Sequence, residues 1–200
     1  MSSLRNIFVI FTFFLPSFLL LASKTTANFN SNLIEKACTI NRPNWDFDFC
    51  IKLLNSDPKI SSATSPFDLA IAIVQAGNSH ASETQDYINQ KLSEGGTNTV
   101  VSSALSVCSK WYGGVLGAFI TALDNVQDQK TFQSAKDHVE SANDYAMNCE
   151  ETFASRDVQD DEISKGDNLV MYFSLSAGAV INVPGDKTIQ HFDLFCCSFL

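Results

Sequence analysis

Apolar residues recur at three- and four-residue spacing along most of the chain, a period typical of amphipathic helices. The first long segment of this kind begins at Ser65-Pro66, where serine can cap the helix and proline suits its first turn. Asp68 adds a negative charge, which the helix dipole favours at this end. The pattern predicts a helix over residues 65–95, ending at a glycine pair. Its apolar face comprises Ala70, Ile73, Val74, Gly77, Ala81, Thr84, Ile88 and Leu92.

Three further apolar stripes follow, at residues 99–127, 130–155 and 167–183. The last is the shortest and contains the strongly apolar run NLVMYFSLSAGAVINV. Connections of only a few residues make consecutive helices antiparallel neighbours. With the segment at 65–95, these stripes predict an all-α fold: a four-helix bundle of up-down-up-down topology.

Two shorter segments precede the bundle and predict an N-terminal helical hairpin. Residues 31–40 run up to the breaker sequence NRPN, and residues 46–55 end at Asp57-Pro58, because proline disfavours helix at the residue before it. Helices of about ten residues are marginal alone in water, so this hairpin needs support from a covalent bridge or from the bundle.

Three glycines lie inside the stripe at 99–127, at positions 113, 114 and 117. A phosphate-binding loop would need the GxGxxG spacing after a strand, and the sequence has neither at this point. We therefore interpret these glycines as positions of close helix packing or of a local kink.

The N-terminus has the three-part layout of a secretory signal peptide. Arg5 precedes the apolar run IFVIFTFFLPSFLLLA, and Thr25 with Ala27 gives the small-x-small pattern that signal peptidase accepts. A membrane anchor is the alternative, but a spanning helix needs about 20 apolar residues, and this run is shorter and contains Pro16. We predict a signal peptide at 1–27, a helical domain at 28–183 and an atypical C-terminal tail at 184–200.

Loss of residues 1–27 would make an already acidic chain more acidic. It removes Arg5 and Lys24 but no acid, so the net charge falls from −9 to about −11. Nucleic-acid binding needs a basic face, so this class of partner is not expected. A negative charge instead favours basic protein partners. No Asn-x-Ser/Thr sequon occurs, so N-glycosylation is not expected either.

The cysteine positions predict two disulfides. Six cysteines follow residue 27, and an oxidising compartment favours their pairing. Cys38 and Cys50 lie on the two arms of the hairpin, while Cys108 and Cys149 lie on the apolar stripes of adjacent antiparallel helices. Four cysteines allow three pairings, and only 38–50 with 108–149 joins neighbouring elements while respecting their faces.

The adjacent cysteines Cys196 and Cys197 lie in the tail and have no secure partner. A zinc site is not predicted, because the sequence has no CxxC pair and its three histidines are scattered. Catalytic motifs such as GxSxG, HExxH and the P-loop are also absent. We predict a protein that is not an enzyme and needs no metal or cofactor.

The hairpin IEKACTINRPNWDFDFCIKLLNSDPK and the later AMNCEETF resemble the plant invertase and pectin methylesterase inhibitor family. The resemblance covers roughly residues 32–183. It implies a four-helix bundle with an N-terminal hairpin and the same two disulfides. It also implies secretion to the apoplast and cell wall, and 1:1 inhibition of a pectin methylesterase or an acid invertase.

The resemblance slightly favours pectin methylesterase as the target. Invertase inhibitors carry Pro-Lys-Phe at the start of the helix with the fourth cysteine, whereas this chain reads Lys130-Thr131-Phe132 after Asp128-Gln129 and lacks the proline. Family members also end soon after the last helix, whereas this chain continues from Pro184 to Leu200.

Inhibition by binding requires a rigid, solvent-exposed surface that loses little entropy on docking. We predict that polar and aromatic positions on the outer faces of the second and third bundle helices form this surface and dock beside the substrate cleft of the target. The alternative is a secreted helical protein that binds a small ligand or simply accumulates, as allergens do, without inhibiting an enzyme. The candidate partner-binding residues are Asn78, Gln85, Lys130 and Phe132.

Overall fold

The computed structural model describes residues 32–95, 98–128 and 131–181, and this part of the chain is helical and contains no strand. The predicted signal peptide and tail, with Cys196 and Cys197, lie outside these residues, as does Lys130. Residues 32–38 are helical. The helices that follow are α2 (Phe47–Ser56), α3 (Pro58–Ser61), α4 (Pro66–Glu94), α5 (Thr99–Gln127), α6 (Phe132–Ala154) and α7 (Asp161–Ile181).

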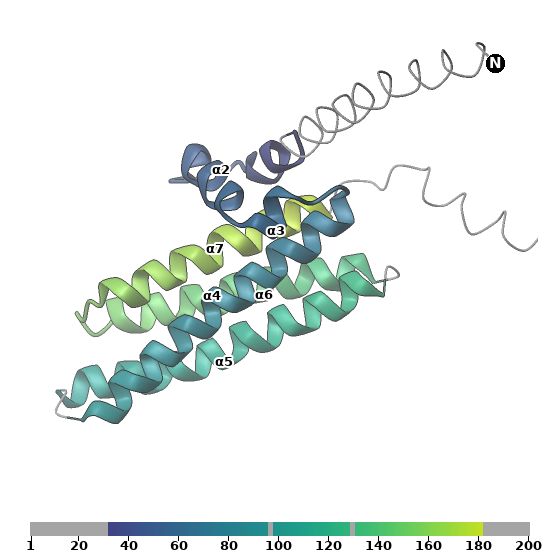
Figure 1. Cartoon of the computed structure of the whole chain (residues 1–200). Helices are drawn as coiled ribbons and strands as arrows, with labels where there is room; N and C mark the ends of the chain where they lie inside the picture. The colour runs from purple at the N-terminus through teal and green to yellow at the C-terminus, as the bar shows by residue number, and fades with distance from the viewer. Residues whose placement is uncertain (1–31, 96–97, 129–130, 182–200) are drawn as a thin grey trace, which may run out of the picture.

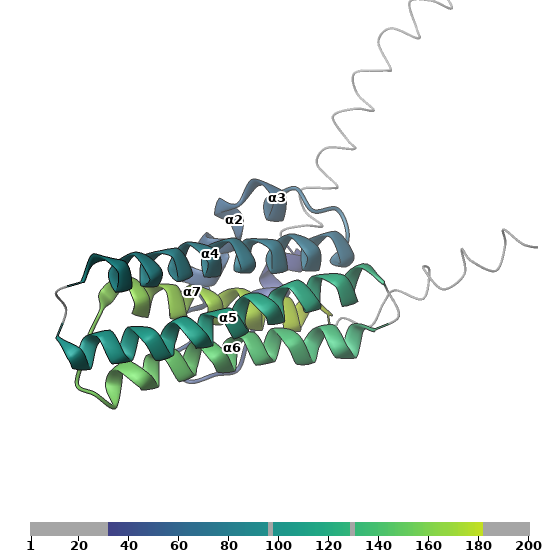
Figure 2. The same cartoon turned by 90° about the horizontal axis from the view of Figure 1, so that it is seen from below.

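The four long helices α4 to α7 form the predicted antiparallel bundle (Figures 1 and 2). Each helix packs against the next along the chain, and α7 closes the bundle by packing against α4. The all-α, up-down-up-down prediction is confirmed. The hairpin made by residues 32–56 lies beside α7, and α3 adjoins the start of α4 (Figure 1).

The start of α4 follows the capping logic of its sequence. The Ser65 hydroxyl accepts a hydrogen bond from the Asp68 backbone N–H at 3.0 Å and donates to Asp68 Oδ2 at 2.8 Å. Pro66 occupies the first turn, where it blocks no intrahelical hydrogen bond. The helix ends at Gly95, whose φ of 65° lies in the left-handed region that glycine tolerates.

The start of α7 differs from the prediction, which placed it at residue 167 instead of Asp161. The Asp160 carboxylate accepts the backbone N–H groups of Glu162 and Ile163, both at 3.2 Å, and so caps an additional polar turn. The apolar run begins only after this turn, and a prediction based on apolar periodicity therefore started too late.

Glycine allows the helices to approach closely at the centre of the bundle. A Cβ atom on Gly77 of α4 would lie 2.7 Å from Phe119 Cζ and 3.0 Å from Phe173 Cβ, so the Phe119 ring and the Phe173 Cβ atom occupy the space that glycine leaves. On α5, a Cβ atom on Gly114 would lie 2.9 Å from the Tyr145 ring. Close packing explains Gly114 but not Gly113 or Gly117, where a Cβ atom would meet open space.

Both predicted disulfides are present, and all four cysteines are fully buried. The Cys38–Cys50 bridge joins residues 32–38 to α2, and the Cys108–Cys149 bridge joins α5 to α6. The first bridge therefore closes the hairpin, and the second fastens the middle pair of bundle helices.

Tyr172 of α7 attaches the hairpin to the bundle. Its hydroxyl oxygen accepts the Asp46 backbone N–H at 3.2 Å. Its ring lies between two aromatic neighbours, with centroid distances of 4.5 Å to Trp45 and 4.8 Å to Phe49. The Cys50 sulfur also lies 3.4 Å from the Ser176 hydroxyl. These contacts fasten the hairpin to α7, and the buried side chains of Leu33, Ile34 and Leu54 join it to the same hydrophobic core as the bundle.

Among the described residues, no helix combines the length and apolar character needed to cross a membrane.

Candidate functional site

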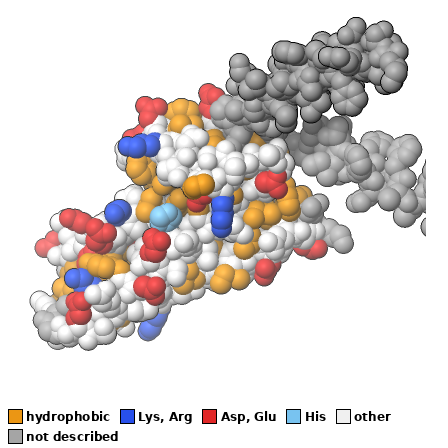
Figure 3. Space-filling view, in the orientation of Figure 1, with side chains coloured by type: hydrophobic (Ala, Val, Ile, Leu, Met, Phe, Trp, Pro, Cys, Tyr) orange, Lys and Arg blue, Asp and Glu red, His pale blue; other side chains and the backbone are white. Residues whose placement is uncertain are grey.

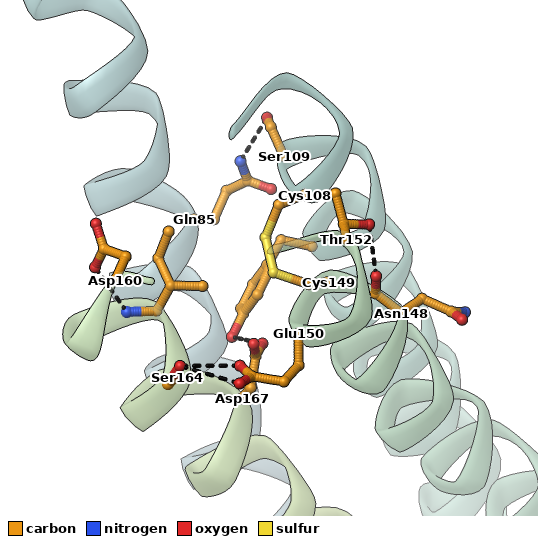
Figure 4. Close-up of a disulfide and its surroundings, with 12 residues drawn as sticks. Gln85, Cys108, Ser109, Asn148, Cys149, Glu150, Thr152, Asp160, Ser164 and Asp167 are labelled. Atoms are coloured by element: carbon orange, nitrogen blue, oxygen red, sulfur yellow. Dashed lines mark hydrogen bonds between the residues drawn. A yellow bond between two sulfur atoms is a disulfide. The ribbon is translucent and has the colours of Figure 1, made fainter. Parts of the chain in front are cut away.

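A hydrogen-bonded polar network covers part of the outer surface between α4 and α5. Gln85 of α4 donates from Nε2 to Asn89 Oδ1 at 3.1 Å and to the Ser109 hydroxyl of α5 at 3.0 Å. Ser109 donates in turn to Asn89 Oδ1 at 3.1 Å. Figure 4 shows the Gln85–Ser109 bond near the Cys108–Cys149 bridge. The network holds Gln85 in a fixed position on a rigid surface, as a docking residue requires.

Asn78 lies seven residues before Gln85 on α4, which places the two on the same side of that helix about two turns apart. Asn78 is half-buried, and its side-chain oxygen is buried without a hydrogen-bond partner in the described part of the chain. A docking protein cannot reach a buried oxygen, so the geometry supports Asn78 less well than Gln85 as a contact residue.

Phe132 begins α6 and its side chain is 42% exposed. The corner before it is held by hydrogen bonds: the Thr131 hydroxyl donates to the Asn125 backbone carbonyl at 3.1 Å and to its side-chain oxygen at 3.2 Å. The Asn125 amide also donates to the Ser134 hydroxyl at 3.0 Å. This corner lies at the same end of the bundle as the start of α4 (Figures 1 and 2), and it presents an aromatic ring to solvent on a fixed backbone.

The candidate contact residues therefore do not form one cluster. Asn78 and Gln85 lie on α4, which is the first bundle helix and not the second or third. Phe132 belongs to the bundle end, and Lys130 lies outside the described residues. The structure also exposes two aromatic side chains of the hairpin that the sequence analysis did not select, Phe47 and Phe49. Figure 3 shows hydrophobic side chains on the outer surface of the hairpin, with acidic side chains beside them. The sequence signal was the alternation of aspartate and phenylalanine in DFDF.

A buried carboxyl group links α7 to α5. Asp167 is only 7% exposed, and its Oδ1 accepts a hydrogen bond from the Tyr112 hydroxyl at 2.8 Å. Burial raises the pKa of Tyr112 well above its ordinary range, and the Asp167 charge adds to this effect, so the phenol remains a donor. Burial also raises the pKa of Asp167 to about 8, although the Tyr112 bond opposes the shift.

Glu150 of α6 completes this group. The Glu150 carboxylate faces Asp167 and raises the pKa of Asp167 further (Figure 4). Glu150 also accepts the Ser164 hydroxyl at 3.0 and 3.2 Å. Asp167 Oδ2 is buried and receives no hydrogen bond from the residues that the structure describes, an arrangement that suits a protonated oxygen donating to Glu150. The group joins α5, α6 and α7 below the Cys108–Cys149 bridge and has a structural role.

A surface groove of about 120 Å³ lies between α4 and α7, lined in part by His80, Tyr87 and Lys165. Its polar groups have neighbours of their own: His80 Nδ1 lies 3.2 Å from a Glu83 oxygen, and the Tyr87 hydroxyl donates to Asp160 at 3.2 Å. Within the described ranges, no three His, Cys, Asp or Glu residues gather as a metal site. The groove thus offers hydrogen bonds but no nucleophile paired with a base.

Comparison with known proteins supplies independent information. The family model described as "Plant invertase/pectin methylesterase inhibitor" matches residues 32–176. The curated protein "Cell wall / vacuolar inhibitor of fructosidase 2" from Arabidopsis thaliana is 29% identical over 152 residues, which are 76% of this chain and 79% of that protein.

Two solved structures share the fold. A crystal structure of a mutant form of a pectin methylesterase inhibitor from Arabidopsis gives a TM-score of 0.62 at 18% identity, covering 68% of this chain and 89% of that chain. A crystal structure of a pectin methylesterase inhibitor from Arabidopsis thaliana gives a TM-score of 0.58 at 16% identity, covering 75% of this chain and 94% of that chain.

Proposed function

The chain belongs to the plant invertase/pectin methylesterase inhibitor family, and from this premise we propose that it binds a carbohydrate-active enzyme of the plant cell wall and blocks its substrate cleft. The family and the matched relatives are inhibitors and not enzymes. In the proposed mechanism, one inhibitor docks on one enzyme and excludes substrate sterically, without covalent chemistry.

The observation that carries this proposal is the exposed Phe132 on its hydrogen-bonded corner. An aromatic anchor on a rigid backbone contributes contact area at little entropic cost, and such anchors account for much of the affinity of protein interfaces. The bundle interior is filled by large side chains such as Tyr112, Phe119 and Phe173, which favours an inhibitor over a carrier of small ligands.

The proposal carries two candidate targets. Pectin methylesterase is the first, because the sequence before Phe132 lacks the proline of the invertase inhibitors. Acid invertase is the second, favoured by the Arabidopsis relative named as an inhibitor of fructosidase and by the exposure of Phe132 at the matching position. The predicted signal peptide and the words "cell wall / vacuolar" in that relative's name support secretion to the apoplast.

A titration of the oxidised protein against a plant pectin methylesterase and an acid invertase at about pH 5–6 tests this function. The expected result is that one of the two activities falls linearly with added protein and is lost near one inhibitor per enzyme, because a stapled bundle binds as a preformed surface. Circular dichroism and a free-thiol assay confirm that the sample is helical and oxidised. If the sample passes both checks and neither activity falls, the proposal is wrong.

Substitution of Phe132 by alanine tests the docking surface. Loss of a central aromatic anchor typically costs about 2 kcal/mol or more, so we expect the inhibition constant to rise by about 30-fold. Because the side chain is exposed, the melting temperature should change little. Val100→Ala is the matched control, since Val100 is equally exposed but lies near the start of α5, at the opposite end of the bundle from Phe132.

Gln85→Ala distinguishes the two candidate faces. Ser109 and Asn89 can still bond each other without Gln85, so the fold should be retained. If Gln85→Ala weakens inhibition and Phe132→Ala does not, the enzyme docks on the α4–α5 face, and the assignment of Phe132 as anchor is wrong.

A further inference from the structure

Met147 occupies an unusual position for a methionine. Its side chain is 49% exposed on the outer surface of α6. Its sulfur lies 3.4 Å from Arg42 Nη2 and 3.4 Å from Asn143 Nδ2, so two N–H donors are directed at it. Asn143 is a neighbour on α6 and is 6% exposed, whereas Arg42 belongs to the hairpin. The thioether is therefore an acceptor shared between the bundle and the hairpin.

A thioether sulfur is a weak hydrogen-bond acceptor, whereas the Arg42 guanidinium and the Asn143 amide are strong donors. A sulfoxide oxygen is polar and accepts strong hydrogen bonds, and one formed with a guanidinium is charge-assisted. From this arrangement we propose that Met147 is a redox modification site, at which oxidation to methionine sulfoxide strengthens the attachment of the hairpin to α6 through Arg42, with Asn143 of α6 as a second donor to the new oxygen.

The oxidant is hydrogen peroxide. A sulfur lone pair of Met147 attacks one peroxide oxygen, the O–O bond breaks, an S–O bond forms, and the second oxygen leaves as water after proton transfer. The thioether loses two electrons and the peroxide gains them. Methionine sulfoxide reductases reverse the step with thiols as reductant, so the modification can act as a switch.

The structure predicts selectivity for this one side chain. Met171 is half-buried and packs against the hydrophobic core, where access of peroxide is restricted. The four described cysteines are in disulfides and have no free thiol to react first. The usual consequence of methionine oxidation is disruption of a core or interface. Here the donors are already in place, and the expected effect is the opposite.

The hairpin is where this effect can be measured. Buried side chains such as Leu33, Ile34 and Leu54 anchor its two arms in the core, whereas none of residues 39–46 between the arms is buried. A stronger hydrogen bond at Arg42 should therefore act on this connecting segment. Within it, the Arg42 backbone N–H bonds the Ile40 carbonyl at 3.1 Å, and the Trp45 N–H bonds the Arg42 carbonyl at 3.2 Å. Amide exchange over residues 39–46 therefore reports the stability of the segment that carries Arg42.

In the test, the purified protein with both disulfides formed is treated with dilute hydrogen peroxide. The oxidation of each methionine-containing peptide is then followed by mass spectrometry. We expect the peptide with Met147 to gain one oxygen at least tenfold faster than the peptide with Met171. Amide exchange over residues 39–46 should then slow by about tenfold, the factor that one net hydrogen bond to a charged group provides. Treatment with methionine sulfoxide reductases should restore the original rate.

Two variants keep the proposal falsifiable. Met147→Leu should make exchange at 39–46 indifferent to peroxide, whereas Met171→Leu should leave the slowing intact. If exchange in the wild type is unchanged or faster after Met147 is oxidised, or if Met171 oxidises first, the proposal is wrong.

Discussion

Replacing both Cys108 and Cys149 by alanine is expected to lower the free energy of unfolding by about 4 kcal/mol, the value that the chain-entropy model gives for a closed loop of this size. The two cysteines are 41 positions apart and join α5 to α6 at fully buried positions. Without the bridge, the unfolded chain regains the conformational freedom of the whole segment between them. Urea denaturation followed by far-UV circular dichroism measures the loss.

The other bridge supplies the matched control. Cys38 and Cys50 are 12 positions apart, so the same model gives about 3 kcal/mol for their loop. This loop lies in the hairpin and not in the bundle, and removing it should release the hairpin while α4 to α7 stay folded. Amide exchange should increase over residues 39–56 when Cys38 and Cys50 are replaced. It should increase throughout the bundle when Cys108 and Cys149 are replaced. Equal changes over both regions in both variants would contradict this division.

Much of the fold could be predicted because local signals and packing agree. The Ser65-Pro66 start of α4 was correct, since serine capping, proline at the first turn and the apolar period all indicate the same boundary. The disulfide pairing followed from placing two cysteines on the arms of the hairpin and two on neighbouring apolar stripes. The start of α7 was missed because its first turn is polar and depends on capping by Asp160. The short helix α3, capped by Asp57, was missed for a similar reason.

The candidate site was less predictable, for two physical reasons. The exposure of an aromatic side chain depends on how the elements pack, so the helical period of the hairpin did not indicate that Phe47 and Phe49 are exposed. A buried polar group, in contrast, leaves a signal that could have been used. Asp167 lies three or four residues from apolar neighbours at Ile163, Val170 and Met171, so a charge at this position should have indicated a buried partner.

The burial of Asp167 beside Tyr112 and Glu150 leads to the last prediction, a decrease in the free energy of unfolding as the pH rises. The pKa of Asp167 is raised by burial from 3.8 to about 8 in the folded protein, so the native state binds an additional proton between these values. The free energy of unfolding falls with pH wherever the native state binds more protons than the unfolded state. The contribution of Asp167 is therefore most favourable below about pH 4 and declines until about pH 8.

Asp167→Asn is expected to remove this decline. The amide oxygen can still accept the Tyr112 hydroxyl, and the amide N–H₂ can donate to Glu150, as we expect of the protonated carboxyl group. At pH 4 the variant and the wild type should have similar stability, whereas at pH 7 the variant should be more stable by on the order of 4 kcal/mol. Urea denaturation at pH 4, 5.5 and 7 measures the difference.

Two neighbouring variants distinguish titration of Asp167 from a general effect of pH. Glu150→Gln removes the negative charge that helps to raise the pKa of Asp167, so the decline should end at a lower pH. Tyr112→Phe removes the hydrogen bond that lowers this pKa, so the decline should extend to higher pH. If the wild type and all three variants lose stability in parallel between pH 4 and pH 8, the pH dependence arises elsewhere. If the decline instead ends at a lower pH in Glu150→Gln and extends to a higher pH in Tyr112→Phe, it arises from Asp167. The neutral Asp167 carboxyl group, which joins three of the four bundle helices, then stabilises the bundle under acidic conditions.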